Sequence, residues 1–190
     1  MNKFNDILKF KYGDIVIAII NSKNYVGFVL KLFKEHSSGS RKLVFVSATK
    51  SHSYFVDLLK KYKVDYNNLC FIDTISKLGG DTINAKSKVI YVNHPSDLTE
   101  ISINIAGCLK STKNNFVVID SLSTLSLYNS TNDLVKFVHL LSQKNKKSKA
   151  ATILLAIKEE LDESFIKKLS GYCDSVVDLS DGKGNYFVEP

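Results

Sequence analysis

Short apolar runs rich in β-branched residues alternate along this chain with segments of helical spacing, and this alternation limits the possible folds more than any other feature. The runs lie at residues 14–20, 42–48, 69–73, 88–93, 116–120, 151–157 and 175–179. Continuous apolar runs of this length are typical of strands that are covered on both faces. The segments between them place apolar residues at helical intervals, at residues 25–34, 51–62, 97–109, 132–143 and 161–169. The pattern predicts an α/β fold, a three-layer α/β/α sandwich around a mostly parallel central sheet.

Local signals support these helices and give no sign of a second domain. Ser51 can cap the second helix, and Asn132 with Asp133 can open the fourth. The lysine-rich "KNKKSK" at residues 144–149 is interpreted as a solvated loop between helix and strand, with a phosphate-binding patch as the alternative. No Pro- or Gly-rich linker divides the chain, so we expect one domain over residues 1–190. The closing "SDGKGNYFVEP" predicts a turn and a final edge strand or hairpin.

The basic charge of the chain permits an anionic partner without requiring one. The formal net charge is +7, and the excess comes from lysines that are spread along the whole sequence. Composition therefore does not separate nucleic-acid binding from a solvated surface. The longest uninterrupted apolar run, Ile15 to Ile20, is far shorter than the ~20 residues that cross a bilayer, and the start lacks an apolar signal-peptide core. We expect a cytoplasmic protein with no membrane partner.

The residue types that most often carry chemistry are scattered along the chain. Cys70, Cys108 and Cys173 are widely spaced, lie in apolar surroundings and form no CxxC pair, which indicates buried, reduced thiols. The four histidines share no metal-ligand spacing, and Ser121 lacks the GxSxG context of a nucleophile. We therefore predict neither a metal site nor a catalytic residue.

Five segments carry a resemblance to a known family. They read "GDIVIAII", "LVFVSATKSHSYFVDLLKKYKVDYNNLCFID", "NFVVIDSLSTLSLY", "TILLAI" and "CDSVVDL". In this order they resemble the core of the RecA/KaiC-like P-loop ATPases, over residues Gly13 to Glu189. The strand that ends at Asp120 is similar to the Walker B strand of that family. The resemblance implies a ligand site at the carboxyl ends of the strands, where the family holds ATP and magnesium.

The loop after the first strand departs from the phosphate loop of that family. The GxxxxGK[ST] motif holds phosphates with backbone N–H groups and a lysine, and its hydroxyl holds magnesium. An ungapped alignment places Lys23 at a glycine position, Tyr25 at the second glycine, Val26 at the lysine and Gly27 at the Ser/Thr. We therefore expect Tyr25 and Val26 to fill the volume that phosphates occupy in the family. The former phosphate loop comprises Asn21, Ser22, Lys23, Asn24, Tyr25, Val26 and Gly27.

Two further positions in the resemblance bear on catalysis. KaiC-like enzymes carry an acidic pair after the second strand, whereas this chain has Thr49 and Lys50 there, so no carboxylate is present to activate water. Asp120 matches the magnesium-binding residue of the family. We interpret it instead as a hydrogen-bond acceptor at a buried strand end, because a lone carboxylate is a poor magnesium site. Lys23 and Lys31 are interpreted as solvated charges, with phosphate binding by either as the alternative.

These departures predict a degenerate, catalytically inactive RecA/KaiC-like domain that acts as a regulatory, binding or assembly module. We expect a protein partner or self-association, and no cofactor. One alternative is an ATP-binding KaiC-like ATPase with a non-standard phosphate loop, which would take ATP and magnesium. The other is a nucleic-acid-binding module, which requires lysines from different segments to converge on one face with exposed aromatic residues among them.

Overall fold

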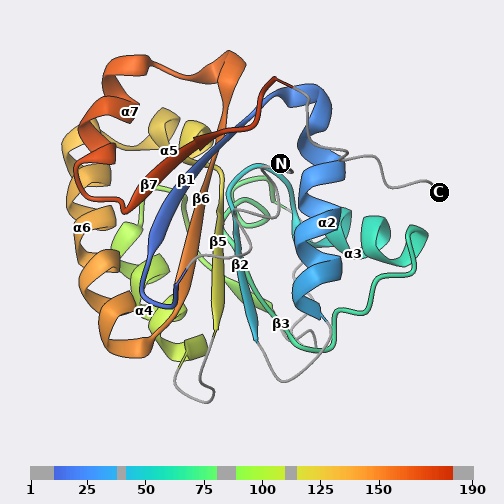
Figure 1. The fold of residues 1–190 in the computed structure, drawn as a ribbon. Coiled ribbons are helices and arrows are strands. Elements are labelled where there is room, and N and C mark those ends of the chain that lie inside the picture. The colour runs from blue at the N-terminus through green and yellow to red at the C-terminus, as the bar shows by residue number, and fades with distance from the viewer. Residues whose placement is uncertain (1–10, 38–41, 81–88, 110–114, 182–190) are drawn as a thin grey trace.

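A single parallel sheet forms the centre of the molecule. The computed structural model describes residues 11–37, 42–80, 89–109 and 115–181, and in these residues seven strands follow the order β4-β3-β2-β5-β6-β1-β7 (Figure 1). Every pair of neighbouring strands is parallel, and β1 lies between β6 and β7. The strands are β1 (Ile15–Ile20), β2 (Leu43–Ser47), β3 (Leu69–Asp73), β4 (Val89–Tyr91), β5 (Phe116–Asp120), β6 (Ala151–Ile157) and β7 (Ser175–Asp178).

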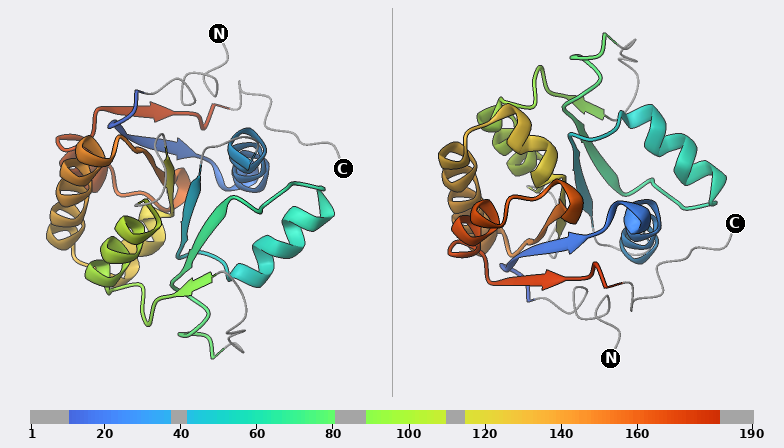
Figure 2. Two further views of the ribbon diagram at one scale, coloured as in Figure 1. Left: turned by 90° about the horizontal axis from the view of Figure 1, so that it is seen from below. Right: turned by 90° about the horizontal axis from the view of Figure 1, so that it is seen from above.

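Helices cover both faces of this sheet (Figure 2). One face carries α2 (Tyr25–Ser37) and α3 (His52–Lys61). The other face carries α4 (Leu98–Leu109), α5 (Leu122–Tyr128), α6 (Thr131–Ser148) and α7 (Glu163–Ser170). Two 3-10 turns follow strands directly: η1 (Ser22–Asn24) after β1, and η2 (Lys158–Glu160) after β6. The predicted three-layer α/β/α sandwich is confirmed.

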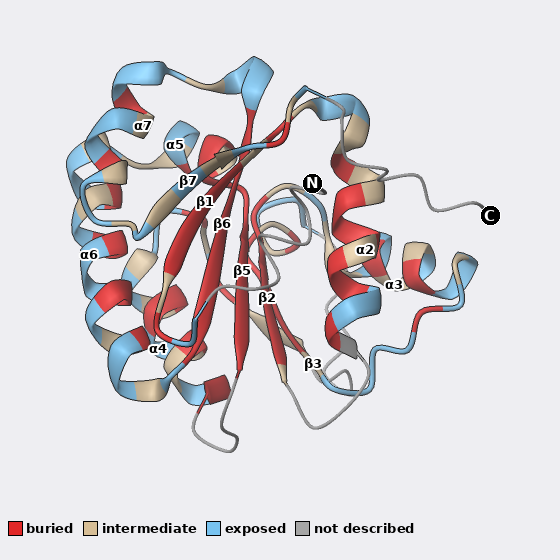
Figure 3. Cartoon of the chain, in the orientation of Figure 1, coloured by how far each residue is buried: buried red, intermediate tan, exposed pale blue. Residues whose placement is uncertain are grey.

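The core has two halves, one on each face of the sheet. The strands β2, β5 and β6 are buried along their whole length, which matches their continuous apolar sequences (Figure 3). The half beneath α2 and α3 is aromatic: the Phe33 and Phe45 rings lie 4.8 Å apart, and the Phe45 and Phe55 rings 5.0 Å apart. The half beneath α4 to α7 is mostly aliphatic. Burial of both faces of the strands is what holds the three layers together.

Helix α6 differs from its predicted bounds at both ends. It begins at Thr131, because the Ser130 Oγ accepts a hydrogen bond from the Asp133 N–H at 3.2 Å, so Asn132 is not the cap. It ends at Ser148, followed by Lys149 in the left-handed region (φ 53°). The predicted loop over residues 144–149 is therefore wrong. Lysine is a good helix former, and the buried Asn145 fastens this last part of the helix by donating to Thr152 Oγ1 at 2.7 Å.

The cysteines correct a second prediction. Cys70 on β3 and Cys108 on α4 are buried as expected, but they form a disulfide, with their Cα atoms 6.4 Å apart. They are 38 residues apart in sequence, and only the packing of α4 against the sheet brings them together. Cys173 is free and half-buried, and burial raises the pKa of its thiol to about 12.

Two other expectations concern a C-terminal strand and membrane-spanning helices. The predicted final strand or hairpin falls on residues that lie, from 182 onward, outside the described part of the structure. Among the described helices, none combines the length and the apolar character needed to span a bilayer.

Candidate functional site

The carboxyl ends of β1, β2, β5 and β6 are the place where this topology can form a ligand site. The connection after β2 leads to α3 on one face, whereas the connection after the neighbouring β5 leads to α5 on the other. Likewise, β1 leads to α2, and the adjacent β6 leads to α7 on the opposite face. Open parallel sheets bind ligands where neighbouring connections diverge in this way. Asp120 and the former phosphate loop both lie at this edge.

A hydrogen bond between two buried side chains joins the former phosphate loop to the end of β5. The Tyr25 hydroxyl donates to Asp120 Oδ2 at 2.6 Å. Asp120 is the last residue of β5 and is fully buried, and Tyr25, the first residue of α2, is only 9% exposed. The side chain of Tyr25 therefore reaches the carboxylate that the RecA/KaiC resemblance matches to a magnesium ligand, although β6 separates β1 from β5 in the sheet.

Burial sets the electrostatics of this pair. Removal from water raises the pKa of Asp120 to about 7; the Tyr25 and Thr49 hydroxyls and the Lys50 charge oppose this shift, and the Glu160 charge adds to it. The second oxygen, Asp120 Oδ1, has no hydrogen-bond partner within the described chain. Burial and the neighbouring carboxylate also raise the pKa of Tyr25, so its hydroxyl keeps its proton and remains the donor.

Three hydroxyl groups from the turn after β2 and from the start of α5 form a row near the end of β5. Thr49 Oγ1 and Thr124 Oγ1 lie 3.1 Å apart, and Ser121 Oγ lies 3.0 Å from Thr124 Oγ1. The exposed Lys50 turns its ammonium group toward the ring of Tyr54, 5.8 Å from the ring centroid. The turn from Thr49 to Lys50 thus places one hydroxyl and one cation near Asp120, and it contains no carboxylate that could act as a base.

A carboxylate of the chain itself binds the start of the former phosphate loop. The Ser22 N–H donates to Glu159 Oε2 at 2.9 Å, and the Ser22 hydroxyl lies 3.2 Å from Glu159 Oε1. Hydrogen bonds from the backbone N–H of Glu159 itself and from Ser22 lower the pKa of this glutamate. Backbone N–H groups at the start of a helix are natural anion sites, and here the anion is Glu159.

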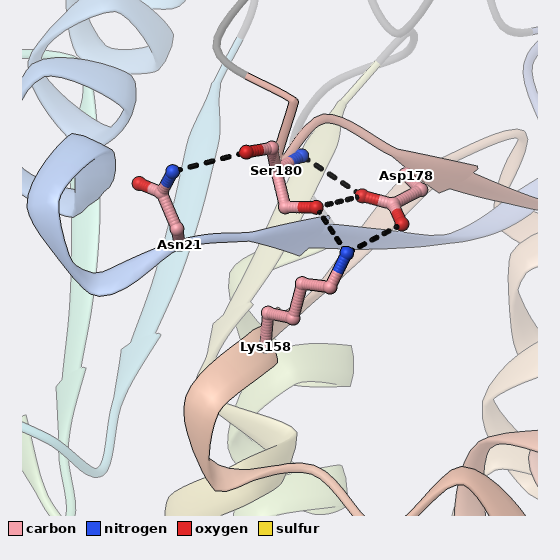
Figure 4. A network of polar contacts seen from close by, with 4 residues as sticks. All are labelled: Asn21, Lys158, Asp178 and Ser180. Carbon is pink, nitrogen blue, oxygen red and sulfur yellow. Dashed lines mark hydrogen bonds and ion pairs between the residues drawn. The ribbon is translucent and has the colours of Figure 1, made fainter.

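A polar network closes the adjoining edge of the sheet (Figure 4). Lys158 Nζ donates to Ser180 Oγ at 2.7 Å and forms an ion pair with Asp178 Oδ2 at 3.4 Å. Asn21 Nδ2 donates to the Ser180 carbonyl oxygen at 3.1 Å, while Asn21 Oδ1 accepts from the Asn24 N–H at 2.9 Å. Residues that follow β1, β6 and β7 are therefore linked to one another by polar side chains.

The other residues of the former phosphate loop make no comparable contacts. Lys23 is exposed, whereas Val26 is half-buried against the aromatic half of the core. Gly27 lies within α2, at the position where the family places its Ser/Thr. Tyr25 and Val26 thus pack against the core, and Lys23, the only lysine of the loop, is exposed.

One family model matches this chain, over residues 33–188. The chain belongs to the DUF7090 family. That family is described as one of unknown function, and no curated protein matches the sequence.

Two solved structures share the fold of this DUF7090 chain. An uncharacterized protein from Pyrococcus horikoshii, crystallised in complex with an unknown peptide, superposes with a TM-score of 0.67 at 10% identity, over 89% of this chain and 78% of that one. A KaiC-like protein from the same hyperthermophilic archaeon gives a TM-score of 0.60 at 15% identity, over 88% of this chain and 73% of that one. The DUF7090 chain therefore has a RecA/KaiC-like fold.

Two groups of the DUF7090 chain itself make hydrogen bonds at Asp120 and at the start of the former phosphate loop. The hydroxyl of Tyr25 occupies one oxygen of Asp120, and Glu159 occupies the N–H group at the start of the loop. A phosphate bound at the start of the loop would meet the Glu159 carboxylate and would lack the lysine of the GxxxxGK[ST] motif. Among the described residues, no group of three or more His, Cys, Asp or Glu side chains could hold a metal ion.

Glu159 and Thr124 were not singled out from the sequence. The rule that selects residues after each strand does point to Glu159, which follows the run at 151–157 by two residues. Its partner, however, depends on β6 lying beside β1, and that adjacency is a property of the sheet order. Thr124 belongs to α5, which the sequence analysis did not predict as a helix.

Proposed function

We propose that this chain is a catalytically inactive RecA/KaiC-like protein that acts as a protein-binding module in regulation or assembly. The observation that carries the proposal is the hydrogen bond from Tyr25 to Asp120. Nucleotide binding in the manner of the RecA/KaiC-like ATPases would require this bond to break, and the fully buried Asp120 would lose its hydrogen bond from Tyr25 at a cost of about 1–3 kcal/mol. Val26 stands at the position of the phosphate lysine, and Thr49 with Lys50 at that of the acidic pair, so the contacts that would offset this cost in the RecA/KaiC-like ATPases are missing at those positions.

A binding role is supported from outside the site. The neighbour that shares this fold most completely of the two was crystallised with a peptide. A RecA/KaiC-like domain without ATPase activity still has helices on both faces of its sheet, and these helices offer rigid surfaces to a partner.

The alternative of nucleic-acid binding has one observation in its favour. On and beside α3, Lys50 lies 5.8 Å from the centroid of the Tyr54 ring, and Lys61 lies 5.4 Å from that of Tyr62. Lysines next to tyrosines can contact both the backbone and the bases of a single strand. If this surface binds nucleic acid, a fluorescent oligothymidine will bind with strong salt dependence, and Lys50→Glu with Lys61→Glu will abolish its binding.

Absence of ATP chemistry is the direct test of the proposal. We expect no phosphate release above background and no rise in melting temperature when Mg-ATP is added to the purified protein. Tyr25→Gly should lower the melting temperature without creating ATP affinity, because Val26 still stands where the lysine is needed.

Two results would contradict inactivity. The first is turnover that disappears in an Asp120→Ala variant. The second is a saturable, nucleotide-dependent rise in the melting temperature of the wild type, which would favour an ATP-binding protein with a non-standard loop.

A further inference from the structure

Two hollows lie next to each other along the seam between α4 and α6, in the layer opposite α2 and α3. The first has a volume of about 440 Å³ and is lined by Leu98 and Ile103 of α4 and by Phe137 and Leu140 of α6. The second has a volume of about 340 Å³ and an aliphatic lining that includes Ile105, Leu109 and Leu141. Lys144 borders both, so together they form one groove along the helices, which we call the α4–α6 groove.

The rim of this groove carries apolar side chains that nothing in the described chain covers. Ile103 on α4 is 62% exposed, and Leu140 on α6 is 56% exposed. The stretch of α4 from residue 101 to 109 contains no charged residue. A helix surface of this kind is typical of a contact face.

Charge is distributed unevenly along the groove. At the end where α4 and α6 begin, Asp97 and Asp133 are present, and Lys136 pairs with Asp133 at 3.4 Å. At the other end, the only charged lining residues are Lys144 and Lys147. Lys144 Nζ donates to Ser102 Oγ of α4 at 2.7 Å, which holds this ammonium group across the seam. The apolar second hollow therefore has a positive rim.

We propose that the α4–α6 groove binds an acidic amphipathic helix of a partner protein. Its aliphatic side chains would fill the two hollows, and its carboxylates would lie over Lys144 and Lys147. A helix suits the site because a groove between two helices can hold the apolar face of a third. The apolar side chains of that third helix would lie at positions i, i+3 or i+4, and i+7. This inference rests on the proposed function as a protein-binding module, and it adds the surface and the partner chemistry.

Other occupants match the groove less well. A second copy of this chain matches the groove less well because each copy carries a net charge of +7, and this charge opposes self-association. Nucleic acid would meet aliphatic hollows without stacking surfaces at the basic end, and Asp97 and Asp133 at the other end.

A pair of synthetic peptides tests the proposal on the full chain. The probe is a fluorescent helical peptide of about 18 residues, built from leucines on one face and glutamates on the other. Its counterpart has lysine in place of every glutamate. We expect the acidic peptide to bind, with affinity that falls as salt rises, and to shift NMR signals of α4 and α6. The basic peptide should bind at least about tenfold more weakly.

Variants locate the contact. Lys144→Glu with Lys147→Glu, and separately Leu140→Glu, should each weaken the acidic peptide by about tenfold or more. The matched controls are Lys60→Glu with Lys61→Glu on α3 and Leu127→Glu on α5, all of them exposed residues outside the groove. They should leave the affinity within about twofold of wild type.

Each other outcome overturns the inference. These outcomes are absence of saturable binding, equal binding of the basic peptide, and NMR shifts confined to another surface. Dimerisation in sedimentation experiments that Leu140→Glu abolishes would assign the groove to a second copy. Peptide binding at another surface would leave the proposed function standing, whereas ATP turnover would remove that function without any change at this groove.

Discussion

At the scale of single residues, the buried Asp120 accepts a hydrogen bond from the Tyr25 hydroxyl. Tyr25→Phe keeps the buried ring but removes this bond to Asp120 Oδ2, so the free energy of unfolding should fall by about 1–3 kcal/mol. Urea unfolding followed by circular dichroism measures the change. Tyr54→Phe is the matched control. Tyr54 is 37% exposed, so loss of its hydroxyl leaves no buried group without a hydrogen bond. Equal effects of the two variants would mean that the buried bond contributes nothing.

The same carboxyl should make stability depend on pH. Its folded pKa of about 7 exceeds the ordinary value of 3.8, so between these values the folded protein holds a proton that the unfolded chain has released. The free energy of unfolding should therefore fall as pH rises from about 4 to 7, by up to about 1.4 kcal/mol per pH unit. Asp120→Asn removes this contribution.

The measurement is the difference in unfolding free energy between wild type and Asp120→Asn at several pH values. Asp133→Asn serves as the control, because hydrogen bonds from Ser130 and Lys136 lower the pKa of Asp133. The stability that Asp133 adds is present above its ordinary pKa and is lost at lower pH, outside the window of Asp120. A wild-type curve parallel to that of Asp120→Asn would show that Asp120 is ionised in the folded protein throughout.

At the scale of helices and strands, α6 depends on its N-terminal cap. Ser130→Ala removes the acceptor for the Asp133 N–H and should lower the free energy of unfolding by about 1 kcal/mol. Ser164→Ala, at an exposed position inside α7, should be neutral or slightly stabilising, because alanine is the better helix former. A loss in Ser130→Ala no larger than that in Ser164→Ala would mean that α6 is held by its packing alone.

The sequence predicts helices and strands well where the apolar pattern is long. It predicts them poorly where a tertiary contact determines the bounds of the element. The strands at 116–120 and 151–157 were predicted with their observed bounds, since each is a continuous apolar run. α5 was missed because its seven residues follow β5 directly and are too few to show a period. The charge of residues 144–149 favours a solvated loop, whereas the structure continues the helix there because Asn145 is buried and bonded to Thr152.

For the site, the strand-end rule located the loop at residues 21–27 and Asp120. It could not foresee the bond between Tyr25 and Asp120 or the contact between Ser22 and Glu159, because both join residues more than 90 positions apart. Contacts of this kind follow from the order of strands in the sheet, which a single sequence does not give.

At the scale of the whole molecule, the disulfide joins the sheet to the layer of α4. Reduction of the bond between Cys70 and Cys108 should lower the free energy of unfolding by about 2–4 kcal/mol, because the unfolded chain regains the freedom of the enclosed loop. Thermal melts with and without reductant measure the loss, and peptide mapping under non-reducing conditions identifies the pair. Cys173→Ser is the control and should retain the sensitivity to reductant. Detection of free thiols at all three cysteines in the protein purified without reductant would contradict the pairing.

The place of β1 between β6 and β7 governs how the protein can fold during its synthesis. Among the described strands, β1 is synthesised first, yet its partners are residues Thr152–Ile157 and Ser175–Asp178, which are made more than 130 positions later. During synthesis its isoleucine-rich segment therefore has no strand partner at a stage when β2, β3 and β5 can already pair with one another. At usual rates of about 5–20 residues per second, this wait lasts roughly ten seconds, during which chaperones or aggregation compete for the exposed strand.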